Sequence, residues 1–127
     1  MRQLVDYEIK LCQTNGRIFE ESINKINMSS PLFIKRFMQS DIAKKFDDLS
    51  FLISSFDYLD ILDEFKNKYQ ETTNSNKYSA EEMYWIGYIY RAICVLYAFS
   101  SKRVFSLISG TTIRRFYFIY HTFDISY

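Results

Sequence analysis

The stretch Ser79–Phe99, SAEEMYWIGYIYRAICVLYAF, decides the fold of this chain. Ser79 and Glu82 have the spacing of a capping box, in which each side chain accepts a hydrogen bond from the other residue's backbone amide at a helix N-terminus. The apolar residues that follow occupy nearly every side of the predicted helix. A helix that is apolar all round is typical of a buried position. The sequence therefore predicts a helix over 80–99 at the centre of a helical bundle.

Apolar residues at helical spacing recur along the rest of the chain, and no strand-like alternation is found. The chain of 127 residues has the length of one domain. We therefore expect an all-α, single-domain bundle over 1–127. A polar linker at 71–78 precedes the central helix. The other helices are expected at 3–27, 31–38, 41–48, 57–69, 100–109 and 113–121.

Side chains that can cap a helix N-terminus mark most of the predicted starts, namely Ser30, Ser40, Asp57 and Ser100. Gly110 is expected to end one helix, and Thr111 or Thr112 to begin the last. Two points stay open. The first helix is either continuous or hinged at Asn15-Gly16, and residues 49–56 form either a helical turn or a short extended segment.

The composition excludes several classes of protein. The formal net charge is +1, which argues against a general affinity for nucleic acid. The longest apolar run, 83–99, is shorter than the ~20 residues that a membrane span needs, and Arg91 interrupts it. The two cysteines, Cys12 and Cys94, are expected to be free and buried, as in a reducing compartment. We expect a cytoplasmic protein with no cofactor.

Arg91 is the most conspicuous candidate binding residue, because it lies in the apolar central helix. Tyr84 and Tyr88 are expected on the same face, seven and three residues away. One interpretation is a pocket of these three residues for an anionic or flat ligand, or for a partner's carboxylate. The favoured interpretation is a structural ion pair in the core. The conceivable carboxylates are Asp41, Asp47, Asp57 and Glu82.

Acidic and aromatic residues give weaker signals. The acidic face of the predicted helix at 57–69 is expected to be solvated, since a metal site formed by carboxylates of one helix is rare; its members are Asp57, Asp60, Asp63 and Glu64. We expect no metal. The 11 Tyr and 12 Phe residues are too many to turn inward together. Some of the following should be exposed, as at protein interfaces: Tyr7, Tyr58, Tyr69, Tyr78, Tyr117, Tyr120 and Tyr127.

His121 is the only histidine, so general acid–base catalysis at neutral pH would depend on it. Arg114 lies seven residues earlier, on the same face of a helix. The pair resembles the Arg, four-to-six residues, His motif of the HEPN ribonucleases, which implies metal-independent RNA cleavage by an all-helical dimer. The favoured interpretation is a half-exposed terminal helix with two solvated arginines, Arg114 and Arg115, and with His121 at its C-terminal end, where a cationic side chain interacts favourably with the helix dipole.

Four segments, at 33–46, 78–91, 100–104 and 120–124, carry a second resemblance. They are similar to small helical proteins of Gram-positive bacteria that are labelled antitoxin-like. The resemblance implies a non-enzymatic protein that binds and neutralises a cognate toxin. Members of that family continue past the position of Tyr127, so the question of a truncation after Tyr127 stays open. The ribonuclease and a scaffold or regulatory protein stay as alternatives, and a homodimer stays open.

Overall fold

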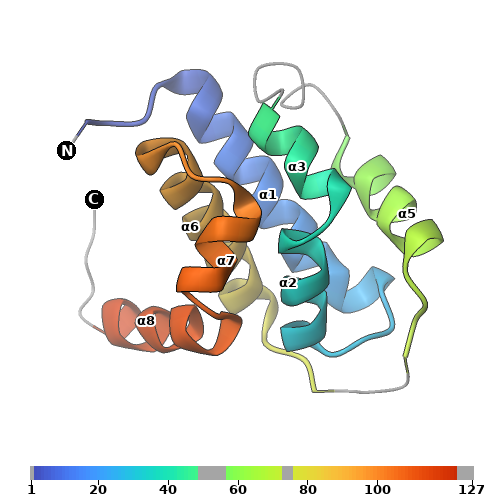
Figure 1. The fold of residues 1–127 in the computed structure, drawn as a ribbon. Coiled ribbons are helices and arrows are strands. Elements are labelled where there is room, and N and C mark those ends of the chain that lie inside the picture. Colours follow the sequence, from blue (N-terminus) through green and yellow to red (C-terminus); the bar gives the residue numbers. More distant parts are fainter. Residues whose placement is uncertain (1, 49–56, 73–75, 123–127) are drawn as a thin grey trace.

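A computed structural model of the chain describes residues 2–48, 57–72 and 76–122, without the side chains of 121 and 122. Within these ranges the chain forms seven helices and no strand (Figure 1). The predicted all-α class is therefore confirmed. The helices are α1 (Asp6–Lys25), α2 (Ser30–Met38), α3 (Asp41–Asp48), α5 (Tyr58–Lys68), α6 (Ala80–Tyr97), α7 (Ser101–Leu107) and α8 (Gly110–Thr122).

Helix α6 occupies the central position that its sequence predicts. Its capping box is formed, with the Glu82 amide donating to Ser79 Oγ at 3.1 Å and the Ser79 amide donating to Glu82 Oε2 at 3.1 Å. Every residue from Glu82 to Leu96 is buried or half-buried. The most extensive contact in the fold joins α6 to α1, and α7 and α8 also pack on α6 (Figure 1).

Two glycines bring α1 and α6 unusually close. A Cβ atom added to Gly87 would lie 2.7 Å from the Asn15 carbonyl oxygen, and one added to Gly16 would lie 2.9 Å from the Tyr84 carbonyl oxygen. Asn15 Nδ2 donates to the Gly87 carbonyl at 2.6 Å across this crossing. Helix α1 is continuous through Gly16, so the hinge alternative is wrong. Gly16 allows α1 and α6 to pack closely and does not bend α1.

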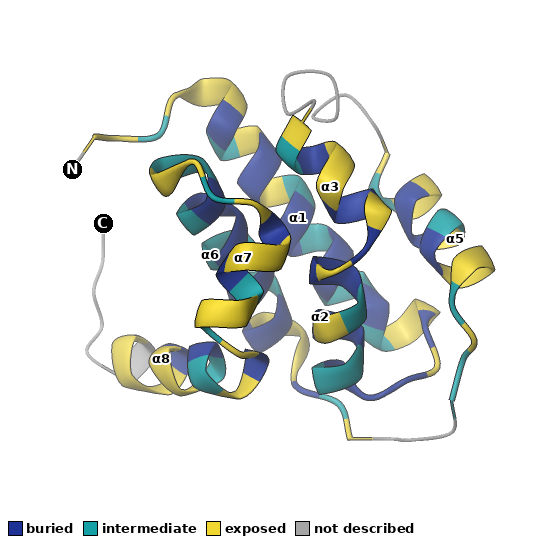
Figure 2. Cartoon of the chain, in the orientation of Figure 1, coloured by how far each residue is buried: buried dark blue, intermediate teal, exposed yellow. Residues whose placement is uncertain are grey.

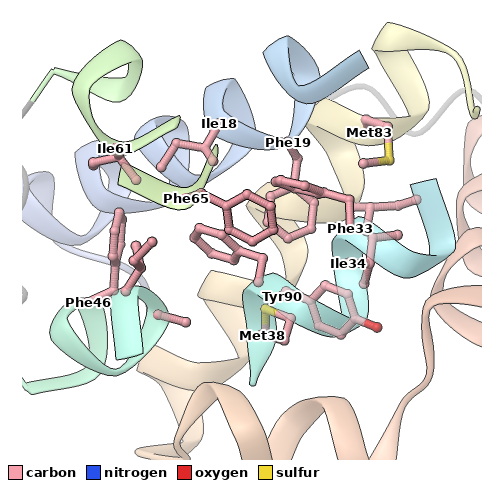
Figure 3. Packing of buried hydrophobic residues seen from close by; sticks show 14 of the residues in the cluster. Ile18, Phe19, Phe33, Ile34, Met38, Phe46, Ile61, Phe65, Met83 and Tyr90 are labelled. Carbon is pink, nitrogen blue, oxygen red and sulfur yellow. The ribbon is translucent and has the colours of Figure 1, made fainter. Parts of the chain in front are cut away.

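Aromatic rings fill the space between α1, α2 and α5 (Figure 3). The Phe19 ring meets the Phe33 and Phe37 rings edge to face at centroid distances of 5.4 and 5.3 Å. The Phe65 ring lies 4.9 Å from Phe33. Such offset and edge contacts suit the charge distribution of the rings, and they stabilise the core beyond simple burial of area.

Most predicted caps are present. Ser40, Asp57 and Ser100 each accept a hydrogen bond from a backbone amide in the first turn of α3, α5 and α7. Three predictions are wrong. Ser29 caps α2 in place of Ser30, and Gly110 begins α8 instead of ending α7. The last helix therefore starts before Thr111 and Thr112, and Ser109 Oγ accepts a hydrogen bond from the Thr112 amide. The two alternatives for 49–56 fall outside the described residues.

The polar linker at 71–78 is tied to the bundle at its end. Lys77 Nζ donates to the carbonyls of Ile23 and Ile26, which lie at the C-terminus of α1. Tyr78 is buried, and its amide donates to Ser30 Oγ at 2.9 Å. These contacts fix where α6 begins.

Candidate functional site

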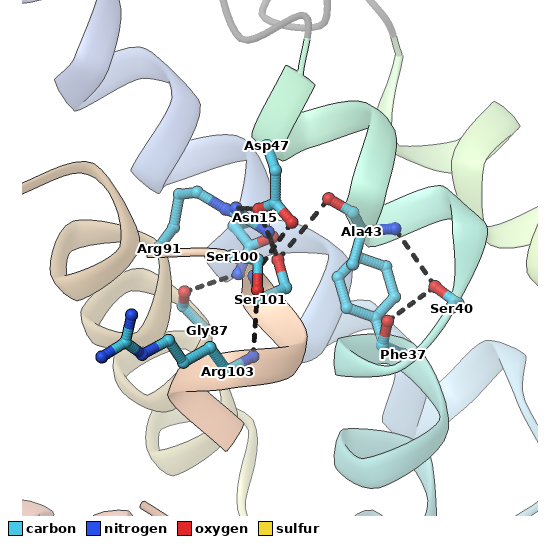
Figure 4. A network of polar contacts seen from close by, with 10 residues as sticks. All are labelled: Asn15, Phe37, Ser40, Ala43, Asp47, Gly87, Arg91, Ser100, Ser101 and Arg103. Carbon is cyan, nitrogen blue, oxygen red and sulfur yellow. Dashed lines mark hydrogen bonds and ion pairs between the residues drawn. The ribbon is translucent and has the colours of Figure 1, made fainter. Parts of the chain in front are cut away.

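Arg91 forms a buried polar network with residues of α3 and α7 (Figure 4). Only 1% of the residue is exposed. Its Nη1 atom donates to Asp47 Oδ1 at 2.6 Å, and its Nη2 atom donates to Ser101 Oγ at 2.8 Å. Asp47 is thus the carboxylate that neutralises Arg91, out of the four that the sequence offered.

Ser101 completes this network. Its amide donates to Asp47 Oδ2 at 2.9 Å, and its hydroxyl donates to Asp47 Oδ1 at 2.7 Å. The guanidinium of Arg91 also lies over the Phe46 ring, 5.2 Å from its centroid. Both carboxylate oxygens and both terminal nitrogens of the guanidinium are therefore engaged. The network joins α3, α6 and α7 at one point, which is the role of a structural ion pair.

A cavity of about 370 Å³ adjoins the network. Its lining includes Glu8, Asp47, Asp48 and Arg91. Glu8 is held by Arg2 through two hydrogen bonds of 2.8 and 2.9 Å, and these bonds lower the pKa of its carboxyl group. Asp47 is half-buried and is engaged by Arg91. Asp48 is exposed and pairs with Lys44 at 3.0 Å. Each of the three carboxylates that line the cavity is therefore paired with a basic side chain.

The thiols of the two cysteines are unreactive at neutral pH. Cys12 and Cys94 are free and buried. Burial raises the pKa of the Cys12 thiol to about 12, and burial also raises the pKa of the Cys94 thiol. A thiol becomes a nucleophile only as its thiolate. At neutral pH both groups are protonated and act as small apolar side chains.

Tyr84 and Tyr88 do not join Arg91 in a common pocket. Their rings are half-buried, with centroids 6.3 Å apart. The Tyr84 ring packs on Gly16 of α1, and burial raises the pKa of both phenols. Arg91 instead turns toward α3 and α7. Helical spacing places the three residues on one side of α6, but Tyr84 packs on α1 whereas Arg91 contacts residues of α3 and α7.

Arg114 is engaged at the N-terminus of α6. Its Nη2 atom donates to Glu82 Oε2 at 3.2 Å, and its guanidinium lies 3.8 Å from the centroid of the Tyr78 ring. Glu82 therefore serves both the capping box and this ion pair. His121 belongs to α8, but its side chain lies outside the described residues. The predicted pairing of Arg114 with His121 stays a prediction.

Helix α8 exposes large apolar side chains, which we call the α8 outer surface: Phe116, Phe118, Ile119 and Tyr120. Their exposed fractions are 39%, 48%, 48% and 51%. The inner side of α8 contributes Ile113 and Tyr117, which are buried, and Tyr117 meets Trp85 at 5.6 Å. Five consecutive apolar residues cannot all face inward on one helix. That run, 116–120, is the signal from which the sequence could have located this surface.

The tyrosines expected at the surface differ in exposure. Tyr7 and Tyr120 are about half exposed, whereas Tyr78 and Tyr117 are buried. The acidic face of α5 is solvated as predicted: its aspartates are exposed, and Glu64 pairs with Lys45 at 3.3 Å. Asp57 additionally caps the helix.

Among the described residues, no cluster of His, Cys, Asp and Glu side chains could hold a metal ion. No described helix is both long enough and apolar enough to cross a bilayer. Comparison of the chain with protein-family models, with curated proteins and with solved structures found no match.

Proposed function

We propose that this protein is a partner-binding module that uses the α8 outer surface, and that its partner is a cognate toxin which it neutralises. The observation that supports binding is the exposure of four large apolar side chains on one helix. Contiguous exposed apolar residues mark interaction sites in soluble proteins. The antitoxin role itself rests on the resemblance to antitoxin-like proteins described above.

The contact between Phe116 and Tyr120 makes this surface suited to protein binding. The two rings are four residues apart and meet edge to face at 6.4 Å, so they present one continuous aromatic ridge. Burying the exposed halves of the four side chains would contribute on the order of 3–6 kcal/mol. That contribution is enough to anchor an interface, because a few buried aromatic residues usually carry most of the binding energy.

The ribonuclease alternative needs Arg114 to hold a phosphate. In the fold, Arg114 is paired with Glu82 and stacked on Tyr78, so substrate binding would have to compete with both contacts. This cost places the ribonuclease second. The scaffold role shares the binding chemistry proposed here and differs only in the partner.

Co-expression with the product of the adjacent gene tests the proposal. We expect that product to be toxic alone, to be tolerated with this protein, and to co-purify with it. The double variant Phe116→Ser/Tyr120→Ser should lose both effects. The matched control is Tyr7→Ser/Leu59→Ser, which removes exposed apolar side chains from α1 and α5 and should keep both effects.

Two results would contradict the proposal. One is full protection and co-purification by the Phe116→Ser/Tyr120→Ser variant. The other is toxicity of this protein itself that disappears in His121→Ala, which would assign the chain to the ribonuclease alternative. Circular dichroism of each purified variant establishes whether it is folded.

A further inference from the structure

The basic residues of the chain are unevenly distributed. Between residues 98 and 122 the sequence contains Lys102, Arg103, Arg114 and Arg115 and no Asp or Glu. The other 12 of the 16 basic residues and all 15 acidic residues lie elsewhere. The near-neutral total charge therefore hides an excess of positive charge along α7 and α8, part of which Glu82 of α6 offsets through its ion pair with Arg114.

Three of these four cations face solvent. Lys102, Arg103 and Arg115 are exposed, whereas Arg114 is neutralised by Glu82. Arg103 lies 3.9 Å from the centroid of the Phe99 ring, which holds its guanidinium close to the surface. Figure 2 shows exposed residues along both α7 and α8, and the C-terminal end of α7 lies close to the start of α8.

Apolar side chains lie among these cations. Leu107 at the end of α7 is 64% exposed, the largest exposed fraction of any large apolar residue described. Arg115 directly precedes the apolar run 116–120 in α8. We call the combined set the α7–α8 surface: Lys102, Arg103, Leu107 and Arg115 together with the α8 outer surface.

We infer that the α7–α8 surface binds an acidic amphipathic segment of a partner protein, an inference that rests on the proposed function and specifies its partner. The apolar side chains would receive the partner's apolar face, and the three cations would meet its carboxylates. Such complementarity steers association and excludes partners of the wrong charge. An amphipathic helix laid against exposed apolar residues is a recurrent mode of recognition.

Two other occupants suit this surface less well. Nucleic acid would use the cations and the rings, but Leu107 and Ile119 offer it neither a stacking plane nor a hydrogen bond. A second copy of the chain, related by two-fold symmetry, would bring the same patch against itself. The three exposed cations of each copy would then face like charges, which is unfavourable.

Binding to defined probes tests the inference. The first probe is a fluorescent peptide with Leu and Phe along one helical face and Glu on the other. The second replaces its Glu residues by Lys, the third scrambles the acidic peptide so that the apolar face is lost, and the fourth is a single-stranded oligothymidine. Fluorescence anisotropy measures binding of each probe at low and high salt. We expect the acidic amphipathic peptide to bind most tightly and to weaken as salt rises.

Charge reversal locates the binding surface. The triple variant Lys102→Glu/Arg103→Glu/Arg115→Glu should bind the acidic peptide about tenfold more weakly, or worse, because three exposed attractions become repulsions. The control Lys10→Glu/Lys44→Glu/Lys45→Glu changes the net charge equally at exposed sites of α1 and α3 and should bind as the parent does. Thermal melts establish that both variants are folded.

Each opposing outcome overturns the inference. In one, the basic peptide or the oligonucleotide binds most tightly of the four probes, and in another the scrambled peptide binds as tightly as the acidic amphipathic peptide. The remaining two outcomes are that no probe binds, and that the parent self-associates in a way that Leu107→Ser abolishes. If the adjacent gene's product still requires Phe116 and Tyr120 but tolerates the triple charge reversal, the proposed function stands and the acidic-partner inference fails. If the acidic peptide binds while that product does not co-purify, the surface assignment stands and the choice of partner is wrong.

Discussion

A single methyl group added at Gly87 should push apart the two helices at the centre of the fold. The Cβ atom of Gly87→Ala would lie 2.7 Å from the Asn15 carbonyl oxygen and 2.8 Å from Cγ of Phe19, whereas ordinary van der Waals contacts are 3.4–4 Å. The nearest obstacle is backbone, which cannot rotate away as a flexible side chain can. Helices α1 and α6 would therefore have to separate by several tenths of an ångström.

The size of the effect follows from two opposed contributions. Replacing Gly by Ala inside a helix contributes up to about 1 kcal/mol of helix propensity. Overpacking a tight contact costs about 1–3 kcal/mol. Separation of the helices also stretches the 2.6 Å hydrogen bond from Asn15 to the Gly87 carbonyl, which costs about 1 kcal/mol when it is lost. We therefore expect a net destabilisation of about 2 kcal/mol.

Urea denaturation followed by circular dichroism measures this loss as a lower midpoint with an unchanged slope. The control is Gly110→Ala, whose Cβ atom would lie 3.3 Å from Ile34 side-chain atoms that can yield. We expect the control to stay within about 0.5 kcal/mol of the parent. A Gly87→Ala variant as stable as the parent would show that the α1–α6 crossing is looser than described, and would refute the reasoning.

Three further predictions concern charges and backbone conformation. Asp47→Asn should lower the free energy of unfolding by about 3 kcal/mol, because it leaves the Arg91 charge buried without a counter-charge; a loss under about 1 kcal/mol in urea would argue against the buried pair. Ala98 has a φ of 54°, a left-handed conformation that glycine adopts more readily than alanine. Ala98→Gly should therefore stabilise the fold by about 0.5–1 kcal/mol, measured as a higher thermal midpoint. A lower midpoint would contradict the left-handed conformation. The hydrogen bonds from Arg2 lower the pKa of Glu8 in the folded state. The pair therefore stabilises the fold at pH values above the pKa that Glu8 has in the unfolded chain, about 4.3. This stabilisation is lost as pH falls through the lower pKa of the folded state. Arg2→Ala should therefore be less stable than the parent at neutral pH, and the difference between them should shrink as pH falls through the folded-state pKa of Glu8, as measured by urea titration at a series of acidic pH values.

Local signals in the sequence predicted most of the helix starts. The caps at Ser40, Asp57, Ser79 and Ser100 depend on contacts between residues two or three positions apart. Such contacts can be read from spacing alone. The buried position of α6 was also predictable, since an all-round apolar helix has no side suited to water.

Contacts between distant segments could not be predicted in the same way. The sequence required a carboxylate for Arg91, but four acids were suitable and only the fold selects Asp47, which is 44 residues away. The sequence leaves a hinge at Gly16 open and predicts a helix end at Gly110, because only the local effect of a glycine is known from sequence. Their actual neighbours, Tyr84 and Ile34, lie on other helices. Spacing carries no information on such neighbours.

The buried network and the exposed surface are physically connected through α7. Ser101, the first residue of α7, is held by Asp47 and Arg91, so the start of this short helix is fixed to α3 and α6. Helix α8 follows after two residues and is held in turn by Arg114 and Tyr117 against α6. Contacts at Ser101 and at Arg114 therefore position a segment that exposes both apolar and cationic side chains. A surface held in this way loses little conformational entropy on binding, and preorganisation of that kind increases affinity without adding contacts. Asp47→Asn should consequently weaken partner binding as well as stability, although Asp47 lies outside the α7–α8 surface.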